Sequence, residues 1–319
     1  FRVRHQEDVV GLRISALHFH PFPSQRTQWK PKLEVRGKPA CLFLLAPLAA
    51  VATAQRCPFA WQDGNVRGLM HISSSFDSGN IDVIDAQNPS SVRLRIRKDA
   101  GEDHFQWFYF RVTGARGTAL TLHIENAGES SYPDGFHGYR ACVSSDRQHW
   151  GRVETSFDGK VLTIHDTPRH DSVYYAYFAP YSLERHADLI ADIACRPQVQ
   201  VERLGSSVDG RDIDLLRIGQ PSSDRRVCWI IARQHPGETM AEFLVEGLLH
   251  RLVDEEDPVS QALLEKAVFY VVPNMNPDGS VRGHLRNNAA GQNLNRAWAE
   301  PTLERSPEVF NVRTEMDRT

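Results

Sequence analysis

The stretch RRVCWIIARQHPGETMAEFLVEGLLHRLVD, residues 225–254, contains the pattern that decides the fold. Its opening residues, 225–233, form a near-continuous apolar run, which is typical of a strand buried on both faces of a sheet. Residues 237–254 have apolar side chains at helical spacing and predict an amphipathic helix. A second apolar run, KAVFYVVPNMNP at 266–277, predicts the next buried strand. Strand, helix and strand in this order indicate a parallel α/β layer, whose ligand sites lie beyond the carboxyl ends of the strands.

Around this layer, residues 181–319 predict the N-terminal part of an α/β domain. Apolar spacing predicts a helix at 182–194 with Ser182 as its N-cap, and two strands follow it. The last stretch, residues 306–319, predicts another helix with Ser306 as its cap. No strand follows that helix in the sequence, so the predicted α/β domain is incomplete.

The segment from 70 to 180 has a different pattern, in which short runs rich in β-branched and aromatic residues alternate with turn signals. Because no long helical pattern interrupts these runs, the segment predicts an antiparallel β-sandwich domain. The aromatic side chains at 107–110 are then expected in the core rather than on a binding face. The predicted strands lie at 81–86, 92–97, 105–112, 119–126, 160–165 and 173–180.

The composition limits the class of protein. A chain of 319 residues with 41% hydrophobic residues is long enough for two domains with cores of their own. Its net charge of −3 argues against a nucleic-acid partner, because phosphate binding needs concentrated positive charge. The 5 cysteines include no CxxC pair, so neither a disulfide framework nor a zinc ribbon is expected, and a cytoplasmic location fits best.

Residues 1–69 stand apart, because they show neither helical nor strand periodicity. Their apolar run at 40–54 is shorter than the roughly 20 residues that a membrane span needs. The run and the small residues behind it resemble a signal peptide, but they lie well inside the chain. Since the first methionine is Met70, we expect 1–69 to be a non-native or disordered extension, and we expect no membrane partner.

Two polar side chains follow the first buried strand directly. His235 comes after the strand, and Glu238 lies three residues later at the start of the predicted helix. Positions i and i+3 of a helical turn share a face, so the imidazole and the carboxylate can converge on one metal ion. Catalytic zinc sites use three such protein ligands and a water. His235 and Glu238 are therefore candidate metal ligands, although such a pair is also common at a solvated helix start.

A long polar loop, residues 274–298, follows the second buried strand. It carries Arg282, Arg286 and Arg296, with Asn295 beside the last of them. Arginine binds carboxylates through two parallel hydrogen bonds, and a long loop in an α/β fold is often functional. The loop is therefore a candidate carboxylate-binding site, and the alternative is a solvated loop with scattered charges.

Four short motifs follow one another in the chain: HPGE at 235–238, NPDG at 276–279, GHLR at 283–286 and NLNR at 293–296. Taken in order, they resemble zinc metallocarboxypeptidases, and more narrowly the cytosolic carboxypeptidase branch and its bacterial relatives. The resemblance implies a carboxypeptidase-like α/β catalytic domain with a mixed sheet behind the β-sandwich. It also implies a Zn²⁺ cofactor and the hydrolysis of C-terminal residues from peptides or proteins. It covers the chain from Met70 onward.

The resemblance also implies a role for each matching residue. His235 and Glu238 match the first two zinc ligands. Arg286 matches the catalytic arginine that polarises the scissile carbonyl and stabilises its oxyanion. Asn295 and Arg296 match the pair that binds the terminal carboxylate of the substrate. These roles suit an exopeptidase, because charge-assisted hydrogen bonds recognise a free chain end.

The family's third zinc ligand, a histidine, and its general base, a glutamate, have no match in this sequence. His250 lies about 18 Å from Glu238 along the helix, by the rise per residue, and His284 lies in the polar loop. We therefore expect the chain to be truncated before the third ligand. We also expect the 319-residue form to bind zinc weakly and to have little or no activity.

Two other functions remain open. An amidohydrolase of N-acyl amino acids would use the same ligands and also bind a carboxylate, although the β-sandwich favours the carboxypeptidase branch. A non-catalytic β-sandwich binding protein with a degenerate peptidase domain would account for the missing ligand and base. The sequence reveals neither which C-terminal residue is removed nor the oligomeric state.

Overall fold

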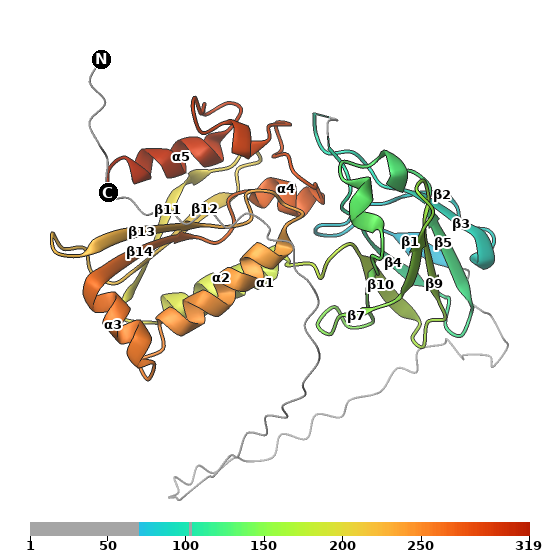
Figure 1. Ribbon diagram of the computed structural model, residues 1–319, viewed down its shortest axis with the longest axis horizontal. Helices are drawn as coiled ribbons and strands as arrows, with labels where there is room; N and C mark the ends of the chain where they lie inside the picture. The colour runs from blue at the N-terminus through green and yellow to red at the C-terminus, as the bar shows by residue number, and fades with distance from the viewer. Residues whose placement is uncertain (1–69, 102–103) are drawn as a thin grey trace, which may run out of the picture. The chain divides into compact units, whose positions relative to one another are not determined.

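The computed structural model describes residues 70–101 and 104–319, and these residues fall within one compact unit. They form a β-rich domain followed by an α/β domain (Figure 1). The predicted N-terminal extension, residues 1–69, lies outside the described residues. In the part of the chain that the structure describes, no helix is both long and apolar enough to cross a membrane.

The β-rich domain is a sandwich of two sheets, each with five strands in the described residues. One sheet has the order β1-β4-β10-β6-β7 and the other has the order β2-β3-β5-β9-β8. Inward-facing side chains of both sheets, such as Phe110 and Leu122, are fully buried in one core, because alternate residues of a strand point to the same face. The strands are β1 (His71–Ser73), β2 (Asp82–Asp85), β3 (Val92–Arg95), β4 (Tyr109–Thr113), β5 (Leu120–Ile124), β6 (Cys142–Ser144), β7 (Gly151–Arg152), β8 (Glu154–Phe157), β9 (Leu162–Asp166) and β10 (Ser172–Ala176).

The β-rich domain differs from the predicted antiparallel sandwich in one pair of strands. β3 and β5 are parallel, because the chain crosses to the other sheet to form β4 and returns in the direction of β3. β1, β6, β7 and β8 were not predicted; the first three of these have only two or three residues, too few to show alternation. The core position of the aromatic side chains at 107–110 is confirmed, because all of them are buried.

The α/β domain contains a mixed sheet, ordered β11-β12-β14-β13 in the described residues. β13 and β14 are parallel, as strand, helix and strand predicted, whereas β12 and β11 are added antiparallel. The helix at 182–194 is confirmed, and the hydroxyl of Ser182 caps it by accepting from the N–H of Arg185 at 3.2 Å. The strands are β11 (Val199–Ser206), β12 (Asp212–Ile218), β13 (Arg226–Ile231) and β14 (Ala267–Val272); the helices are α1 (Leu183–Ala194), α2 (Thr239–Leu252), α3 (Pro258–Lys266), α4 (Pro277–Arg282) and α5 (Pro307–Met316).

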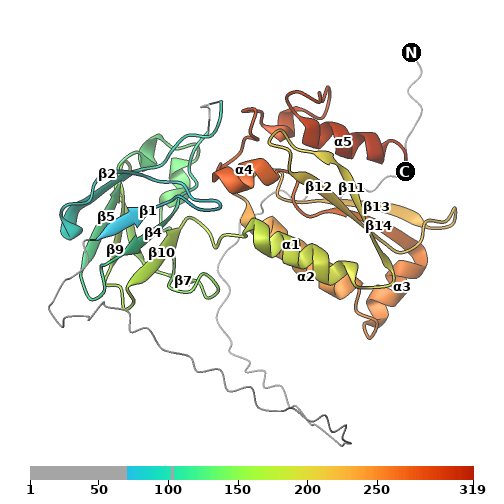
Figure 2. The same cartoon turned by 180° about the vertical axis from the view of Figure 1, so that it is seen from behind.

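Helices cover both faces of this sheet (Figure 1 and Figure 2). Leu189 of α1 and Leu249 of α2 pack against one face, whereas Val312 of α5 packs against the other. All residues of β14 are buried between these layers, as its apolar sequence predicted. The polar motifs begin at the carboxyl ends of β13 and β14, which is where ligand sites lie in sheets of this kind.

β13 and α5 differ in detail from the prediction. β13 lies at the edge of the sheet within the described residues, and of its side chains only Trp229 and Ile230 are buried. The expected burial on both faces is therefore wrong for most of this strand. The side chain of Ser306 does not cap α5, because its hydroxyl accepts from the N–H of Thr302 at 3.1 Å instead.

Candidate active site

The turn between β13 and α2 brings His235 and Glu238 together. The Nδ1 atom of His235 lies 3.1 Å from the Oε1 atom of Glu238. Glu238 stands directly before α2, but its side chain makes no capping hydrogen bond and points to His235. The N–H of Glu238 donates to the carbonyl of His235 at 3.0 Å and closes the turn. Two candidate metal donors thus lie side by side beyond the carboxyl end of a strand.

The geometry of this pair fits two ligands of one zinc ion. Tetrahedral zinc bonds place two donor atoms about 3.4 Å apart, close to the 3.1 Å between these two side chains. The Nε2 atom of His235 is buried and has no hydrogen-bond partner within the described residues, although a ligating histidine normally donates from its second nitrogen. Across residues 70–101 and 104–319, no group of three or more His, Cys, Asp or Glu side chains is placed to hold a metal ion. The described residues therefore supply two candidate zinc ligands.

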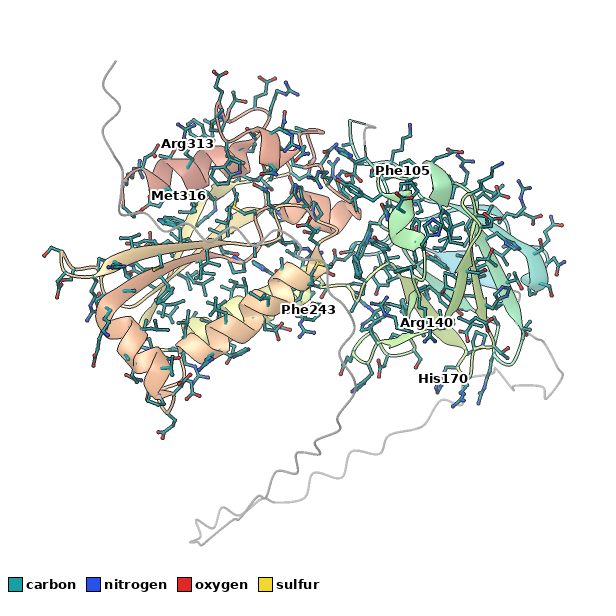
Figure 3. All side chains as sticks on the ribbon, in the orientation of Figure 1. Phe105, Arg140, His170, Phe243, Arg313 and Met316 are labelled. Carbon is teal, nitrogen blue, oxygen red and sulfur yellow. The ribbon has the colours of Figure 1, made fainter. Side chains whose placement is uncertain are left out.

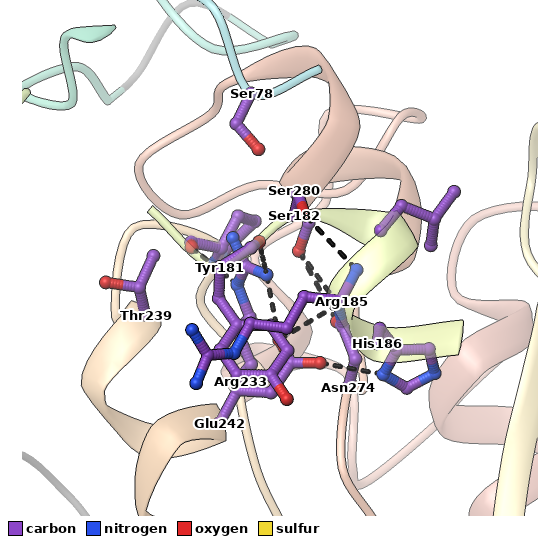
Figure 4. Close-up of polar contacts among 12 residues, drawn as sticks. Ser78, Tyr181, Ser182, Arg185, His186, Arg233, Thr239, Glu242, Asn274 and Ser280 are labelled. Carbon is purple, nitrogen blue, oxygen red and sulfur yellow. Dashed lines mark hydrogen bonds and ion pairs between the residues drawn. The ribbon is translucent and has the colours of Figure 1, made fainter. Parts of the chain in front are cut away.

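Arg233, two residues before His235, fixes the shape of the turn. It is buried and has a φ of 46°, a left-handed conformation that is uncommon for residues other than glycine. Its guanidinium donates to the carbonyls of Pro236 at 3.1 Å and Tyr181 at 2.7 Å. It also pairs with Glu242 of α2 at 2.8 Å (Figure 4). These bonds offset the backbone strain and tie the turn to α2.

Glu242 extends this contact into a network of buried charges that sequence analysis missed. Its Oε1 lies 2.7 Å from Nδ1 of His186, whose Nε2 lies 3.2 Å from Asp214 (Figure 4 shows His186 beside Glu242). Burial alone would lower the pKa of His186, but the hydrogen bonds to Asp214 and Glu242 outweigh burial and raise the pKa to about 9. The available signal was the position of Glu242 on the apolar face of α2, where a carboxylate is rarely buried without a partner.

The polar loop after β14 begins with a helix, α4, that was not predicted. Its end is marked by Gly283, which has a φ of 69° and forms the left-handed C-cap. Arg282 pairs with Asp209 at 2.7 Å, and the buried Asp278 accepts from Arg211 at the same distance. The first part of the loop is therefore anchored to the β11–β12 hairpin, and Arg282 has a structural role.

Arg286 and Arg296 line a cavity of about 430 Å³, together with Arg305. None of these three side chains forms an ion pair with another described residue. No Asp or Glu side chain from the described residues lines the cavity either. The guanidinium of Arg286 lies 6.0 Å from the ring centre of Tyr132, in a cation–π contact. The cavity is therefore suited to an anionic ligand.

Asn295, the other predicted carboxylate ligand, does not line this cavity. Its backbone carbonyl accepts from the guanidinium of Arg296 at 3.1 Å. Two residues of the β-rich domain, His104 and Tyr132, line the cavity and were not predicted to do so. No sequence signal marked them, because only the folded chain brings them to the loop.

Hydrogen bonds join the separate motifs into one site. The N–H of Gly237 donates to the carbonyl of Leu285 at 3.0 Å, directly before Arg286. The indole of Trp298 donates to the side-chain carbonyl of Gln234 at 2.6 Å. Arg313 of α5, labelled in Figure 3, donates to the carbonyl of Trp298 at 2.7 Å. The turn with His235, the Arg286 segment and the end of the loop therefore lie together.

The two other histidines considered as ligands have other partners. His250 lies 3.6 Å from Asp192 on α1. The Nδ1 atom of His284 lies 3.0 Å from the carbonyl of Asn287, and its Nε2 accepts from the N–H of Ala100 at 3.3 Å. In the described residues both histidines are therefore engaged away from the pair His235 and Glu238.

Comparisons with known proteins find relatives of both domains. Residues 72–178 match the family described as the cytosolic carboxypeptidase N-terminal domain, and residues 188–314 match the family described as zinc carboxypeptidase. An uncharacterised protein of Zymomonas mobilis is 55% identical over 250 residues, which are 78% of this chain and 65% of that protein. Human cytosolic carboxypeptidase 1 is 26% identical over 291 residues, with 77% of this chain and 24% of that protein covered.

Two solved bacterial structures are similar over more than three quarters of the chain. A metallo-carboxypeptidase from Burkholderia cenocepacia is 51% identical, with a TM-score of 0.77 over 78% of this chain and 68% of that chain. A metallo-carboxypeptidase from Pseudomonas aeruginosa, in complex with (2-guanidinoethylmercapto)succinic acid, is 49% identical, with a TM-score of 0.74 over 78% of this chain and 66% of that chain. The chain spans about two thirds of the length of these bacterial relatives. It belongs to the zinc carboxypeptidase family, in the branch that carries the cytosolic carboxypeptidase N-terminal domain.

Proposed function

We propose that this protein is a zinc-dependent carboxypeptidase that removes C-terminal residues from peptides or proteins. The hydrogen bond between Gly237 and Leu285 carries the proposal, because it holds the candidate zinc ligands beside Arg286. Metal ligands and anion-binding arginines serve one reaction only when they are adjacent. The chain spans about two thirds of the length of its bacterial relatives, so the activity of the whole protein is a proposal. A cytoplasmic location, which the names of the cytosolic relatives support, is part of the proposal.

Each arginine has a distinct role in the proposed reaction. Arg296, with Asn295 beside it, binds the terminal carboxylate of the substrate through charge-assisted hydrogen bonds. Arg286 stabilises the negative charge that develops on the oxygen of the scissile carbonyl. Both guanidinium groups are available for these roles, because neither is paired with a described carboxylate.

His235 and Glu238 are the residues that would hold the zinc ion. When bound, the ion supplies Lewis-acid chemistry, polarising the carbonyl and activating a water molecule. Arg233 and Glu242 keep the turn rigid, so that the two donor atoms stay close together before the ion binds. The proposed site therefore combines a partly formed metal centre with an arginine-lined cavity.

The relative from Pseudomonas aeruginosa supports the substrate class. Its ligand is a derivative of succinic acid, a dicarboxylic acid. We propose that carboxylates of this kind bind the present protein at Arg286 and Arg296. A succinic acid derivative should then inhibit the enzyme by competing with the substrate's terminal carboxylate.

The proposal is tested with three matched substrates and the full-length protein. We expect release of the C-terminal residue from a peptide with a free carboxylate, and none from the same peptide with a C-terminal amide. An N-acyl amino acid should be a poor substrate. Faster cleavage of the N-acyl amino acid would favour the amidohydrolase, and no cleavage of any substrate would favour a binding protein.

A further inference from the structure

One buried carboxylate of the β-rich domain holds the backbone that carries Arg286. Asp99 is 2% exposed, and its Oδ1 accepts from the N–H of Leu285 at 2.7 Å. Its Oδ2 accepts from the N–H groups of Arg286 at 2.6 Å and Asn287 at 2.9 Å. Three successive N–H groups, centred on the proposed catalytic arginine, therefore end on a single side chain.

The backbones on either side of these bonds approach each other closely. A Cβ on Gly101 would lie 2.8 Å from the carbonyl oxygen of Gly291, and a Cβ on Gly291 would lie 2.9 Å from the nitrogen of Gly101. Both glycines have a positive φ, which other residues rarely adopt. The side-chain amide of Asn287 also donates to the carbonyl of Ala100 at 2.9 Å. The backbones of the two segments therefore pack directly against each other at Gly101 and Gly291.

Side chains around Arg286 reinforce this contact. Leu285 is buried in a cluster with Trp107 and Tyr109 of the β-rich domain. The guanidinium of Arg286 lies over the ring of Tyr132, which also belongs to that domain. The β-rich domain thus contacts the backbone of Arg286, its guanidinium and the residue before it.

We propose that Asp99 is a positioning residue, which orients Arg286 for catalysis by fixing the backbone of residues 285–287. This role rests on the proposed carboxypeptidase function. A carboxylate accepts hydrogen bonds only, so it can bind three N–H groups at once without an internal conflict. Displacing a catalytic group by about 1 Å can cost about 100-fold in rate. The β-rich domain therefore has a part in the reaction through Asp99, although Asp99 does not contact the substrate.

Hydrogen exchange tests the structural part of the proposal without any assay of activity. In Asp99→Asn the acceptor oxygens fall from two to one, so we expect the amides of residues 285–287 to exchange at least about tenfold faster. Asp158→Asn is the matched control, because Asp158 accepts from the N–H groups of Lys160 and Val161, both at 2.8 Å. It should accelerate exchange only in its own turn. Unchanged exchange at 285–287 in Asp99→Asn would overturn the proposal.

Kinetics of the zinc-loaded full-length protein test the catalytic part. We expect Asp99→Asn to lower kcat by about 10- to 100-fold while KM changes little, because Arg296 keeps its place. In an Arg286→Gln background the same substitution should have no further effect, since Asp99 acts through Arg286. Losses that multiply in the double variant, or an unchanged kcat in the single one, would contradict this role.

Two further observations separate the possible failures. A wild-type protein without peptidase activity would refute the proposed function. An active wild type whose kcat is unchanged in Asp99→Asn would refute only the role of Asp99. Thermal unfolding shows whether Asp99→Asn remains folded, and Asp99→Ser is the second variant if it does not. Loss of folding in both variants would assign Asp99 to stability alone and overturn the proposal.

Discussion

The N–H of Gly237 donates to the carbonyl of Leu285 at 3.0 Å, so the two halves of the candidate site meet at the backbone. A Cβ at Gly237 would lie 3.0 Å from that carbonyl oxygen and 3.1 Å from Cδ1 of Leu285. The contact therefore admits a side chain at position 237 only if Leu285 shifts. It fixes the position of His235 and Glu238 relative to the segment that carries Arg286.

Gly237→Ala should disturb this contact, because the new methyl group would push Leu285 away. We expect a loss of about 1–3 kcal/mol of unfolding free energy, together with a lower kcat/KM. Gly247→Ala on α2 is the matched control, since a Cβ there meets nothing within 4 Å. It should leave activity unchanged and stabilise the fold slightly, by about 0.5–1 kcal/mol. Equal stability and activity in both variants would contradict the steric argument.

Glu242→Gln should destabilise the protein, because it leaves the buried guanidinium of Arg233 without its countercharge. Breaking a buried ion pair from one side typically costs about 3–5 kcal/mol. Glu246→Gln, one turn later on α2, removes the partner of the half-exposed Arg185 and should cost about 1 kcal/mol or less. Denaturant unfolding of both variants measures the difference, and similar values would show that the network is not stabilising.

Stability should depend on pH through His186, whose pKa of about 9 in the folded protein lies above the ordinary value of 6.5. The stabilisation is then complete below pH 6.5 and is lost as the pH rises through 9. Over that window the loss should be on the order of 3 kcal/mol. Thermal melts between pH 6 and 10 measure it. His186→Gln should flatten the profile in this window, and an unchanged slope would assign the effect to another group.

The two cavity arginines should affect different kinetic constants. Arg296→Ala should raise KM by about 10- to 100-fold, because one charged hydrogen-bonding group is lost from the carboxylate site. Arg286→Lys should mainly lower kcat, since lysine cannot reproduce the planar guanidinium. Arg282→Ala is the control, because Arg282 pairs with Asp209 and does not line the cavity. An unchanged KM in Arg296→Ala would exclude Arg296 as the carboxylate ligand.

Local patterns predicted much of the fold. Ser182 and the apolar spacing after it gave the start of α1, because a helix cap is a local interaction. The apolar run of β14 and the strand-helix-strand order gave the parallel pair. The parallel pairing of β3 and β5 was missed, since it depends on a crossing between sheets that leaves no local signal.

The residues of the candidate site likewise include some that local sequence predicted and some that it did not. His235 and Glu238 are close in sequence, so their meeting in space follows from one turn. Asp99 lies far from Arg286 in the chain, and neither periodicity nor spacing connects the two. Contacts between distant segments become visible only when the buried polar groups of the folded chain are matched with their partners.

The metal dependence of C-terminal release by the full-length protein tests the central claim most directly. We expect a chelator to abolish release of the C-terminal residue, and added Zn²⁺ to restore it in the wild type. His235→Ala should bind zinc more weakly in a direct titration and should remain inactive at zinc concentrations that saturate the wild type. Undiminished release in the presence of the chelator, or full activity of His235→Ala, would contradict the assignment of His235 and Glu238 as zinc ligands.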